Sequence, residues 1–212
     1  GELVLRFTNN ALINIEGSDL FIFEVGKFIE STELSISKDG VNWVSIGTIK
    51  GAKAEVDIEP FTNKGDVFDY IKLFDLKTEC RGMWPGADID AVATIGSAKR
   101  VSFTSNVLFN FNESTLKPEA KKLLDELTTE INQNSIKRII VEGYTDSLGT
   151  AEFNKNLSLS RAKTVQSYLT KKLVNKKITI NALGLGESNP LFNNTTKENQ
   201  EKNRRVEIIL IR

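Results

Sequence analysis

Histidine is absent from the 212-residue sequence, and Cys80 is its only cysteine. The lack of histidine excludes Ser-His-Asp and Cys-His catalytic arrangements and histidine-rich zinc sites. A single cysteine excludes a disulfide bond within the chain and is neutral about redox compartment. No apolar run approaches the about 20 residues that a membrane-spanning helix needs. We therefore expect no ordinary hydrolase and no membrane span, although a hydrolase that uses only carboxylates stays open.

The net charge of zero conceals an uneven distribution of charge along the chain. Residues 1–100 contain 11 basic and 16 acidic side chains, and residues 101–212 contain 17 basic and 12 acidic ones. The two parts therefore differ in sign, which favours two domains with different partners. The lysines of the basic part are scattered, and aromatic residues are not interleaved with them. This pattern favours a solvated surface over a nucleic-acid-binding patch.

The first hundred residues contain short segments that are rich in β-branched and aromatic residues. We expect strands over residues 2–7, 20–25, 33–37, 43–46, 54–58 and 70–76, with turns at residues 16–19, 38–40, 63–66 and 84–86. The Asp39-Gly40 pair between two alternating runs is a strong hairpin signal. Strands at this spacing, without a helical period, predict a domain over residues 1–98 that is an antiparallel β-sandwich.

A helical pattern begins after residue 117, where Pro118 suits the first helical position. Its apolar face consists of Ala120, Leu123, Leu124, Leu127 and Ile131. We expect further strands over residues 101–109, 138–144, 178–183 and 205–211. Two further helices are expected, one that starts between residues 151 and 158 and one over residues 195–203. This order predicts helices on one face of a mixed sheet. The whole chain is therefore assigned to the α+β class, with a domain boundary near residue 98.

The most informative stretch covers residues 141–162. A strand ends at Gly143, Asp146 follows in a loop, and Gly149 permits a turn before the next helix. Helix N-termini favour anions, and Arg161 adds donors that suit a carboxylate. Asp146 supplies an acceptor for an ammonium group, so the two residues fit a ligand with an amino-acid-like head group. The alternative is that Asp146 caps the helix and forms an internal salt bridge with Arg161.

This stretch resembles the OmpA-like, or peptidoglycan-associated, domain family, whose signature is approximately G-H-T-D-x-x-G-x-x-x-Y-N-x-x-L-S-x-x-R-A. The matching positions are Gly143, Thr145, Asp146, Gly149, Asn154, Leu157, Ser158, Arg161 and Ala162. Residues 107–112 with Leu116, and residues 184–190 with residues 203–208, match in the expected order, so the resemblance covers residues 101–212. Tyr144 replaces the usual histidine and Phe153 the usual tyrosine. Neither belongs to the charged pair, so we expect binding with altered pocket walls.

The resemblance implies that residues 99–212 form a two-layer β/α domain that binds peptidoglycan without covalent chemistry. Asp146 would contact the ammonium group of the diaminopimelate in the stem peptide, and Arg161 would contact its carboxylate. The other pocket residues that the resemblance implies are Thr145, Asn154, Leu157, Phe111 and Arg205. It further implies a non-enzymatic anchor in the periplasm of a Gram-negative envelope, associated with the outer membrane through a missing N-terminal part.

The first domain carries weaker signals. Residues 35–47 resemble a hairpin of discoidin-like, galactose-binding-type jelly rolls, a motif that records a tight turn and a buried Trp43. Asp88 and Asp90 lie two residues apart and would suit Ca²⁺, the one cofactor considered, although turn capping by Asp88 is the alternative. The partner of this domain stays open. An adhesin or carbohydrate-binding protein, acting through this domain, is the alternative function, and a stator-like motor component is a second one.

Overall fold

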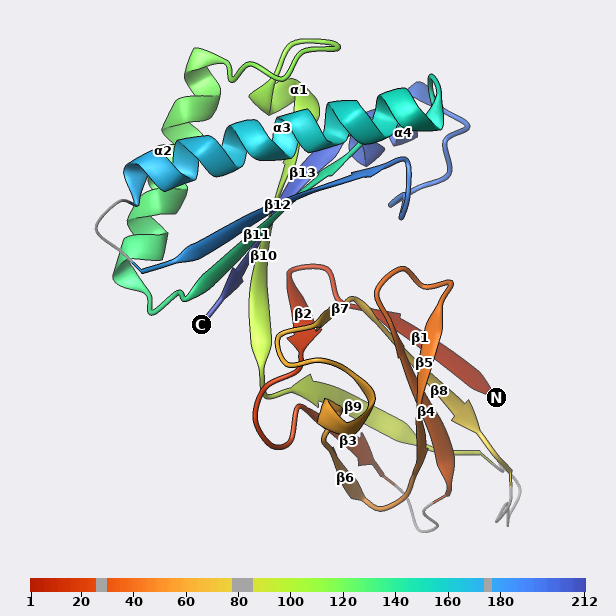
Figure 1. The fold of residues 1–212 in the computed structure, drawn as a ribbon. Helices are drawn as coiled ribbons and strands as arrows, with labels where there is room; N and C mark the ends of the chain where they lie inside the picture. The colour runs from red at the N-terminus through yellow and green to blue at the C-terminus, as the bar shows by residue number, and fades with distance from the viewer. Residues whose placement is uncertain (26–29, 78–85, 174–176) are drawn as a thin grey trace. The chain divides into compact units, whose positions relative to one another are not determined.

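The computed structural model describes residues 1–25, 30–77, 86–173 and 177–212 (Figure 1). The chain divides into two compact units, Gly1–Ala98 and Lys99–Arg212. Cys80 and the first two residues of the turn expected at 84–86 lie outside the described residues. The elements place the protein in the α+β class, as the sequence predicts.

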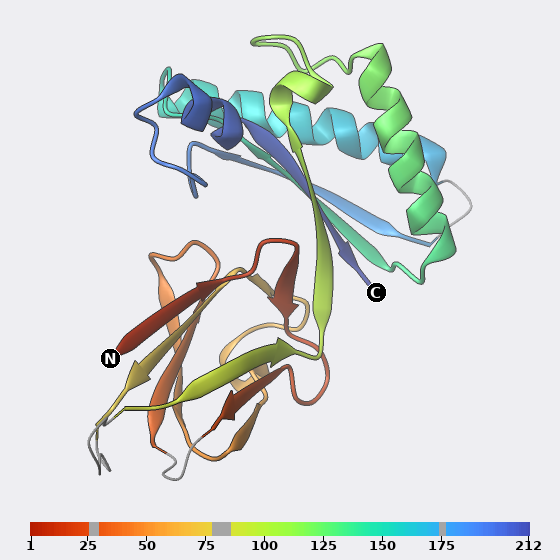
Figure 2. The same cartoon turned by 180° about the vertical axis from the view of Figure 1, so that it is seen from behind.

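The first unit consists mainly of short strands. Its elements are β1 (Glu2–Arg6), β2 (Asn10–Ile13), β3 (Leu20–Glu24), β4 (Thr32–Ser37), β5 (Trp43–Ile49), β6 (Lys53–Val56), the 3-10 helix η1 (Glu59–Phe61), β7 (Val67–Phe68), β8 (Tyr70–Asp75) and β9 (Ile89–Thr94). One antiparallel sheet has the order β1-β8-β4-β5 and another the order β6-β3-β9, while β2 pairs with β7. Figure 2 shows the two sheets facing each other.

Alternation along the strands builds the core of this unit. Leu34 and Ile36 of β4 and Leu20 and Ile22 of β3 are all buried, and they belong to one apolar cluster. Because successive side chains of a strand point to opposite faces, every second residue of each sheet enters the space between the sheets. The predicted antiparallel β-sandwich is therefore confirmed.

The expected hairpin joins β4 to β5. Ser37 lies opposite Trp43 in the register, and Gly40 has a φ of 74°, which favours glycine. The Asp39 carboxylate closes the turn, since Oδ1 accepts from the backbone N–H of Val41 at 2.8 Å and of Asn42 at 2.7 Å. Trp43 was expected to be buried but is only partly so, and Lys72 Nζ lies 4.5 Å from its ring centroid.

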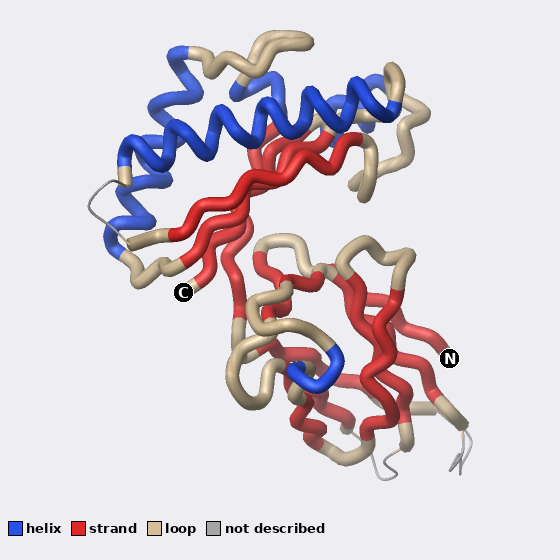
Figure 3. Tube along the Cα trace, in the orientation of Figure 1, coloured by secondary structure: helices blue, strands red, loops and turns tan. Residues whose placement is uncertain are grey.

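The second unit combines a mixed sheet with helices. Its elements are most of β10 (Ser97–Thr104), then α1 (Ser105–Leu108), α2 (Pro118–Gln133), β11 (Arg138–Tyr144), α3 (Ala151–Lys172), β12 (Thr179–Gly186), α4 (Lys197–Asn203) and β13 (Arg205–Ile211). The strand order is β12-β11-β13-β10, with β11 parallel to β12 and antiparallel to β13. Figure 3 shows α2 and α3 on one face of this sheet.

The strand expected over residues 101–109 is confirmed as far as Thr104, but the prediction is wrong for residues 105–108, which form α1. β10 ends at Thr104, opposite Arg205, the first residue of β13. No residue of β13 remains to pair with the chain beyond this point, so Ser105 starts the helical turn α1. Its backbone N–H donates to the carbonyl of Arg204 at 2.7 Å, which fixes the turn beside the start of β13.

Two glycines set the position of α3 on the sheet. A Cβ atom on Gly143 of β11 would lie 2.1 Å from the carbonyl oxygen of Ser158, and one on Gly184 of β12 would lie 2.4 Å from the backbone nitrogen of Leu159. The backbone of α3 therefore rests directly on both strands, which only glycine permits. The hydroxyl of Ser158 also accepts from the N–H of Gly186 at 2.9 Å. These contacts fix the part of α3 that faces the loop after β11.

Candidate functional site

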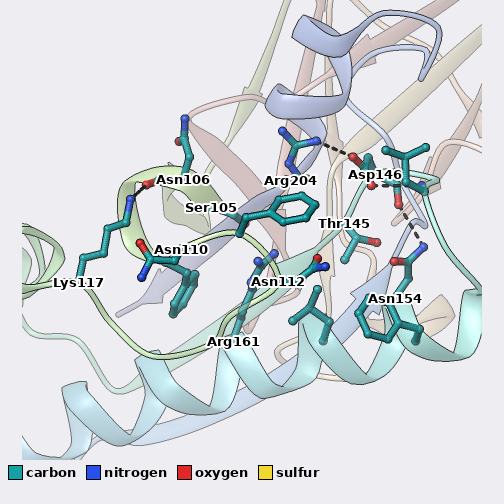
Figure 4. A pocket seen from close by; sticks show the side chains of 15 residues that line it. Ser105, Asn106, Asn110, Asn112, Lys117, Thr145, Asp146, Asn154, Arg161 and Arg204 are labelled. Atoms are coloured by element: carbon teal, nitrogen blue, oxygen red, sulfur yellow. Dashed lines mark hydrogen bonds and ion pairs between the residues drawn. The ribbon is translucent and has the colours of Figure 1, made fainter.

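A pocket of about 210 Å³ lies in the second unit (Figure 4). It is bounded by the loop after α1, the loop after β11, the first half of α3 and the residue before β13. Six of the seven residues that the resemblance implies line it, namely Phe111, Thr145, Asp146, Asn154, Leu157 and Arg161. The glycine contacts beneath α3 explain this convergence, because they hold the helix against the strand that delivers Thr145 and Asp146.

Asp146 is 5% exposed, and its ion-pair partner is Arg204. Arg204 Nη1 lies 2.5 Å from Asp146 Oδ2, while Oδ1 accepts from the backbone N–H of Leu148 at 3.2 Å. Gly143 lies opposite Val206 in the register, so residues that follow β11 lie beside residues that precede β13. Strand register thus brings together two residues that are 58 apart in the sequence.

The alternative of an internal Asp146–Arg161 salt bridge is wrong, because the ion-pair partner of Asp146 is Arg204. The two side chains, both in described parts of the chain, form no ion pair within 4 Å, although both line the pocket. The alternative of an Asp146 helix cap is also wrong. Thr150 caps α3, because its hydroxyl accepts from the backbone N–H of Phe153 at 3.2 Å.

Arg161 is 3% exposed and lines the pocket. Its Nε donates to the carbonyl oxygen of Glu113 at 2.9 Å, and its guanidinium lies 5.4 Å from the ring centroid of Phe109. Nη1 is buried and has no hydrogen-bond partner. Burial lowers the pKa of Arg161 below its ordinary value, and the charge of Arg204 adds to this effect while Asp146 opposes it. The side chain is a desolvated cation that suits a carboxylate.

Thr145 and Asn154 complete the polar wall. The Thr145 hydroxyl is buried without a partner, whereas its backbone N–H donates to the carbonyl of Gly186 at 2.8 Å. Asn154 Nδ2 donates to the carbonyl oxygen of Asp146 at 3.3 Å and to Glu187 Oε2 at 2.8 Å. Asn154 therefore braces the loop that carries Asp146, and Thr145 offers a free hydroxyl.

Arg205 does not line the pocket, which corrects its expected role. It is 1% exposed, its Nε donates to Glu207 Oε1 at 2.6 Å, and its guanidinium lies 3.7 Å from the ring centroid of Tyr144. Neighbouring residues in extended backbone point in opposite directions, so Arg204 faces the pocket and Arg205 the opposite side. The run Asn203-Arg204-Arg205 predicts a pocket-edge role for at least one arginine, and the arginine that lines the pocket is Arg204.

Of the two departures from the family signature, only one lies in the pocket wall. Tyr144 is 2% exposed, and its hydroxyl donates to Glu142 Oε2 at 2.8 Å. Burial raises the pKa of Tyr144 well above its ordinary value, and the charges of Glu142 and Glu207 raise it further. Phe153 lines the pocket and is 48% exposed. Together with Phe111 and Leu148, which are still more exposed, it forms an apolar rim.

Asp88 and Asp90 are both exposed, the first before β9 and the second within it. Among the described residues, no group of three or more histidine, cysteine, aspartate or glutamate side chains is placed to hold a metal ion. Two exposed carboxylates alone supply few of the six to eight oxygen ligands that Ca²⁺ takes. A calcium site here stays a prediction, and so does a glycan partner of the first unit.

Residues 108–204 match the family model described as the OmpA family. These residues form an OmpA family domain. The chain is 40% identical over 114 residues to outer membrane protein A of Bordetella avium, a match that covers 54% of this chain and 58% of that protein. The chain thus spans little more than half of this relative's length.

Solved structures also resemble the part of the chain that contains the OmpA family domain. A MotB-like protein from Desulfovibrio vulgaris is 31% identical with a TM-score of 0.49, over 54% of this chain and 76% of that chain. The peptidoglycan-associated lipoprotein from Burkholderia pseudomallei is 23% identical with a TM-score of 0.43, over 49% and 87%. In the described parts of this protein, no helix has the length and apolar character to cross a membrane.

Proposed function

We propose that the OmpA family domain binds peptidoglycan and anchors the protein to the cell wall, with the diaminopimelate of a stem peptide held in the pocket. The observation that carries the proposal is a pair of buried polar atoms without partners, Arg161 Nη1 and Thr145 Oγ1, on residues that line the same pocket as Asp146. A buried polar group without a hydrogen bond lowers stability. A ligand that bonds these atoms removes that penalty, which favours its binding.

The charges of the pocket suit a zwitterionic head group. Arg161 Nη1 and the Thr145 hydroxyl would donate to a ligand carboxylate, and the Asp146 carboxylate would accept from its ammonium group. The charged lining residues are Lys117, Asp146, Arg161 and Arg204, three cations and one anion. This excess of positive charge favours ligands with more carboxylate than ammonium groups. The apolar rim would cover the methylene chain between the two ends of diaminopimelate.

Binding without reaction is the role that these residues support. The sequence contains no histidine, and the pocket holds its carboxylate in an ion pair with Arg204. The name of the Bordetella relative, outer membrane protein A, supports a setting at the periplasmic side of the outer membrane. A domain that grips the stem peptide there would tether the rest of the protein to the wall.

Co-sedimentation with purified diaminopimelate-type sacculi tests the proposal. Asp146→Ala and Arg161→Ala should bind at least about tenfold more weakly than wild type, because each removes one end of the head-group contact. Arg161→Lys should also bind weakly, since an ammonium group cannot reproduce the planar guanidinium. Glu152→Ala and Lys155→Ala change exposed residues of α3 outside the pocket lining and serve as matched controls.

The outcome depends on folded variants, so each is first compared by circular dichroism and thermal melting. Wild type and both controls should sediment equally with the sacculi. If Asp146→Ala and Arg161→Ala are folded and sediment like wild type, the proposed site is wrong. If wild type itself stays in the supernatant, the anchoring function is wrong.

A further inference from the structure

A second hollow lies further along α3, toward its C-terminal end. Its volume is about 440 Å³, and it is bounded by residues 114–116, the first turn of α2 and the second half of α3. Lys121 of α2 and Lys163 and Lys171 of α3 line it, together with hydroxyl side chains that include Thr115 and Ser167. We refer to this hollow as the lysine groove.

No acidic side chain in the lining of the lysine groove neutralises its positive charge. Its lining residues include three lysines and no acidic side chain. The nearby carboxylate of Asp125 pairs with a lysine outside the groove, since its Oδ1 lies 2.8 Å from Lys172 Nζ. The same oxygen accepts from the Tyr168 hydroxyl at 2.8 Å. The three lysines of the groove make no ion pair with any described residue. A cationic surface with hydroxyl groups suits a ligand that carries carboxylates and further hydroxyl or amide groups.

The lysine groove and the pocket share two walls. The loop after α1 contributes Phe111 and Asn112 to the pocket and Ser114 to the groove, and between them the carbonyl of Glu113 accepts from Arg161 Nε. Helix α3 contributes residues 153–161 to the pocket and residues 163–171 to the groove. Ten residues of helix, from Arg161 to the last lysine, span about 15 Å. An extended peptide covers that distance with about five residues.

We propose that the lysine groove is a second subsite, which binds the acidic remainder of a glycopeptide whose amino-acid head group occupies the pocket. This inference rests on the proposed function and extends it from one residue of the stem peptide to the carboxylate-bearing chain attached to that residue. The pocket would select the head group, and the groove would add affinity through charge-assisted contacts with the chain. Because these lysines are exposed, each contact adds little, and the effect depends on all three.

Two soluble probes separate the subsites: free meso-diaminopimelate, and a disaccharide tripeptide that ends in diaminopimelate. Isothermal titration calorimetry should show that wild type binds the glycopeptide more tightly than the free amino acid. The triple variant Lys121→Gln, Lys163→Gln, Lys171→Gln should lose about tenfold in affinity for the glycopeptide and keep its affinity for diaminopimelate. Its affinity should also depend less steeply on salt.

A matched control removes the same charge from elsewhere in the second unit. Lys122, Lys177 and Lys197 are exposed and lie outside the groove, so their triple glutamine variant should bind both probes like wild type. Equal losses in the two triple variants would show an effect of net charge alone and overturn the subsite. Unchanged glycopeptide binding by the groove variant would overturn it as well. If wild type binds neither probe, the proposed function fails together with the subsite.

Discussion

The carboxylate of Asp146 lies 2.5 Å from the guanidinium of Arg204, a residue that follows it by 58 positions in the sequence. The side chain of Asp146 is 7% exposed, whereas that of Arg204 is 27% exposed. If Asp146 is removed, water can reach and solvate the Arg204 guanidinium. If Arg204 is removed, water has little access to the Asp146 carboxylate. This difference makes the pair asymmetric, and the asymmetry is measurable.

Arg204→Gln should destabilise the protein more than Asp146→Asn does. Removal of the cation leaves a buried carboxylate with its charge uncompensated, and we expect a loss of about 1–3 kcal/mol in the free energy of unfolding. Removal of the anion leaves an arginine that water can reach, so the loss should stay below about 1 kcal/mol. Urea denaturation of both variants measures the difference. Equal losses in the two variants would contradict the conclusion that the Asp146 carboxylate is the more buried partner.

Thr145→Val should weaken sacculus binding without lowering the stability of the protein. The hydroxyl is buried without a partner, and valine has nearly the same shape, so the free energy of unfolding should stay constant or rise by about 1 kcal/mol. Sacculus binding should fall, because the variant cannot donate to a ligand carboxylate. The two measurements are thermal melting and co-sedimentation. A variant that loses stability and binds like wild type would show that the hydroxyl has a structural role.

Gly143→Ala should disrupt the domain. The new Cβ would lie 2.1 Å from the carbonyl oxygen of Ser158, a backbone atom that cannot move without the rest of α3. We expect a loss of about 3 kcal/mol or more, and a displaced α3 that no longer forms the pocket. Gly1→Ala is the control, since nothing lies within 4 Å of the added atom. Wild-type stability of Gly143→Ala, by urea denaturation, would show that α3 is not held by this contact.

Asp39→Ala should destabilise the first unit in a pH-dependent way. Although partial burial alone would raise its pKa, hydrogen bonds from Asn42, Val41 and Ser37 lower the pKa of Asp39 from 3.8 to about 2. A depressed carboxylate pKa gives stability that is complete above about pH 4 and is lost as the pH falls through 2. The variant should therefore be about 1–2 kcal/mol less stable than wild type at pH 7. The difference should shrink toward pH 2, and a constant difference would assign the effect to lost packing.

Much of the second unit follows from its sequence, because its helices and strands have clear periods. The final strand begins at Arg205 and β11 at Arg138, both as predicted, and Pro118 starts α2. In the first unit, β2 and β7 were missed because four and two residues are too few to show alternation. The strand β9 was missed because Asp88, which precedes it, and Asp90, which lies within it, suggested a metal site or a turn.

The pocket was predictable as a set of residues but not as a set of contacts. A family motif places Asp146 and Arg161 at fixed positions, and both line the pocket. The choice of partner for Asp146 depends on the register between β11 and β13, which periodicity does not determine. The side to which Arg204 or Arg205 points depends on where β13 starts, so a shift of one residue reverses the assignment.

The hydrogen bond of Arg161 Nε has a consequence for the rate at which the domain would release a ligand. Because Nε is tied to the carbonyl of Glu113, the rotamer of this long side chain is fixed before any ligand arrives. The conformational entropy of ordering an arginine is then lost when the protein folds and not when it binds. A site ordered in advance gains mainly in residence time, which is the property that the proposed anchoring role requires.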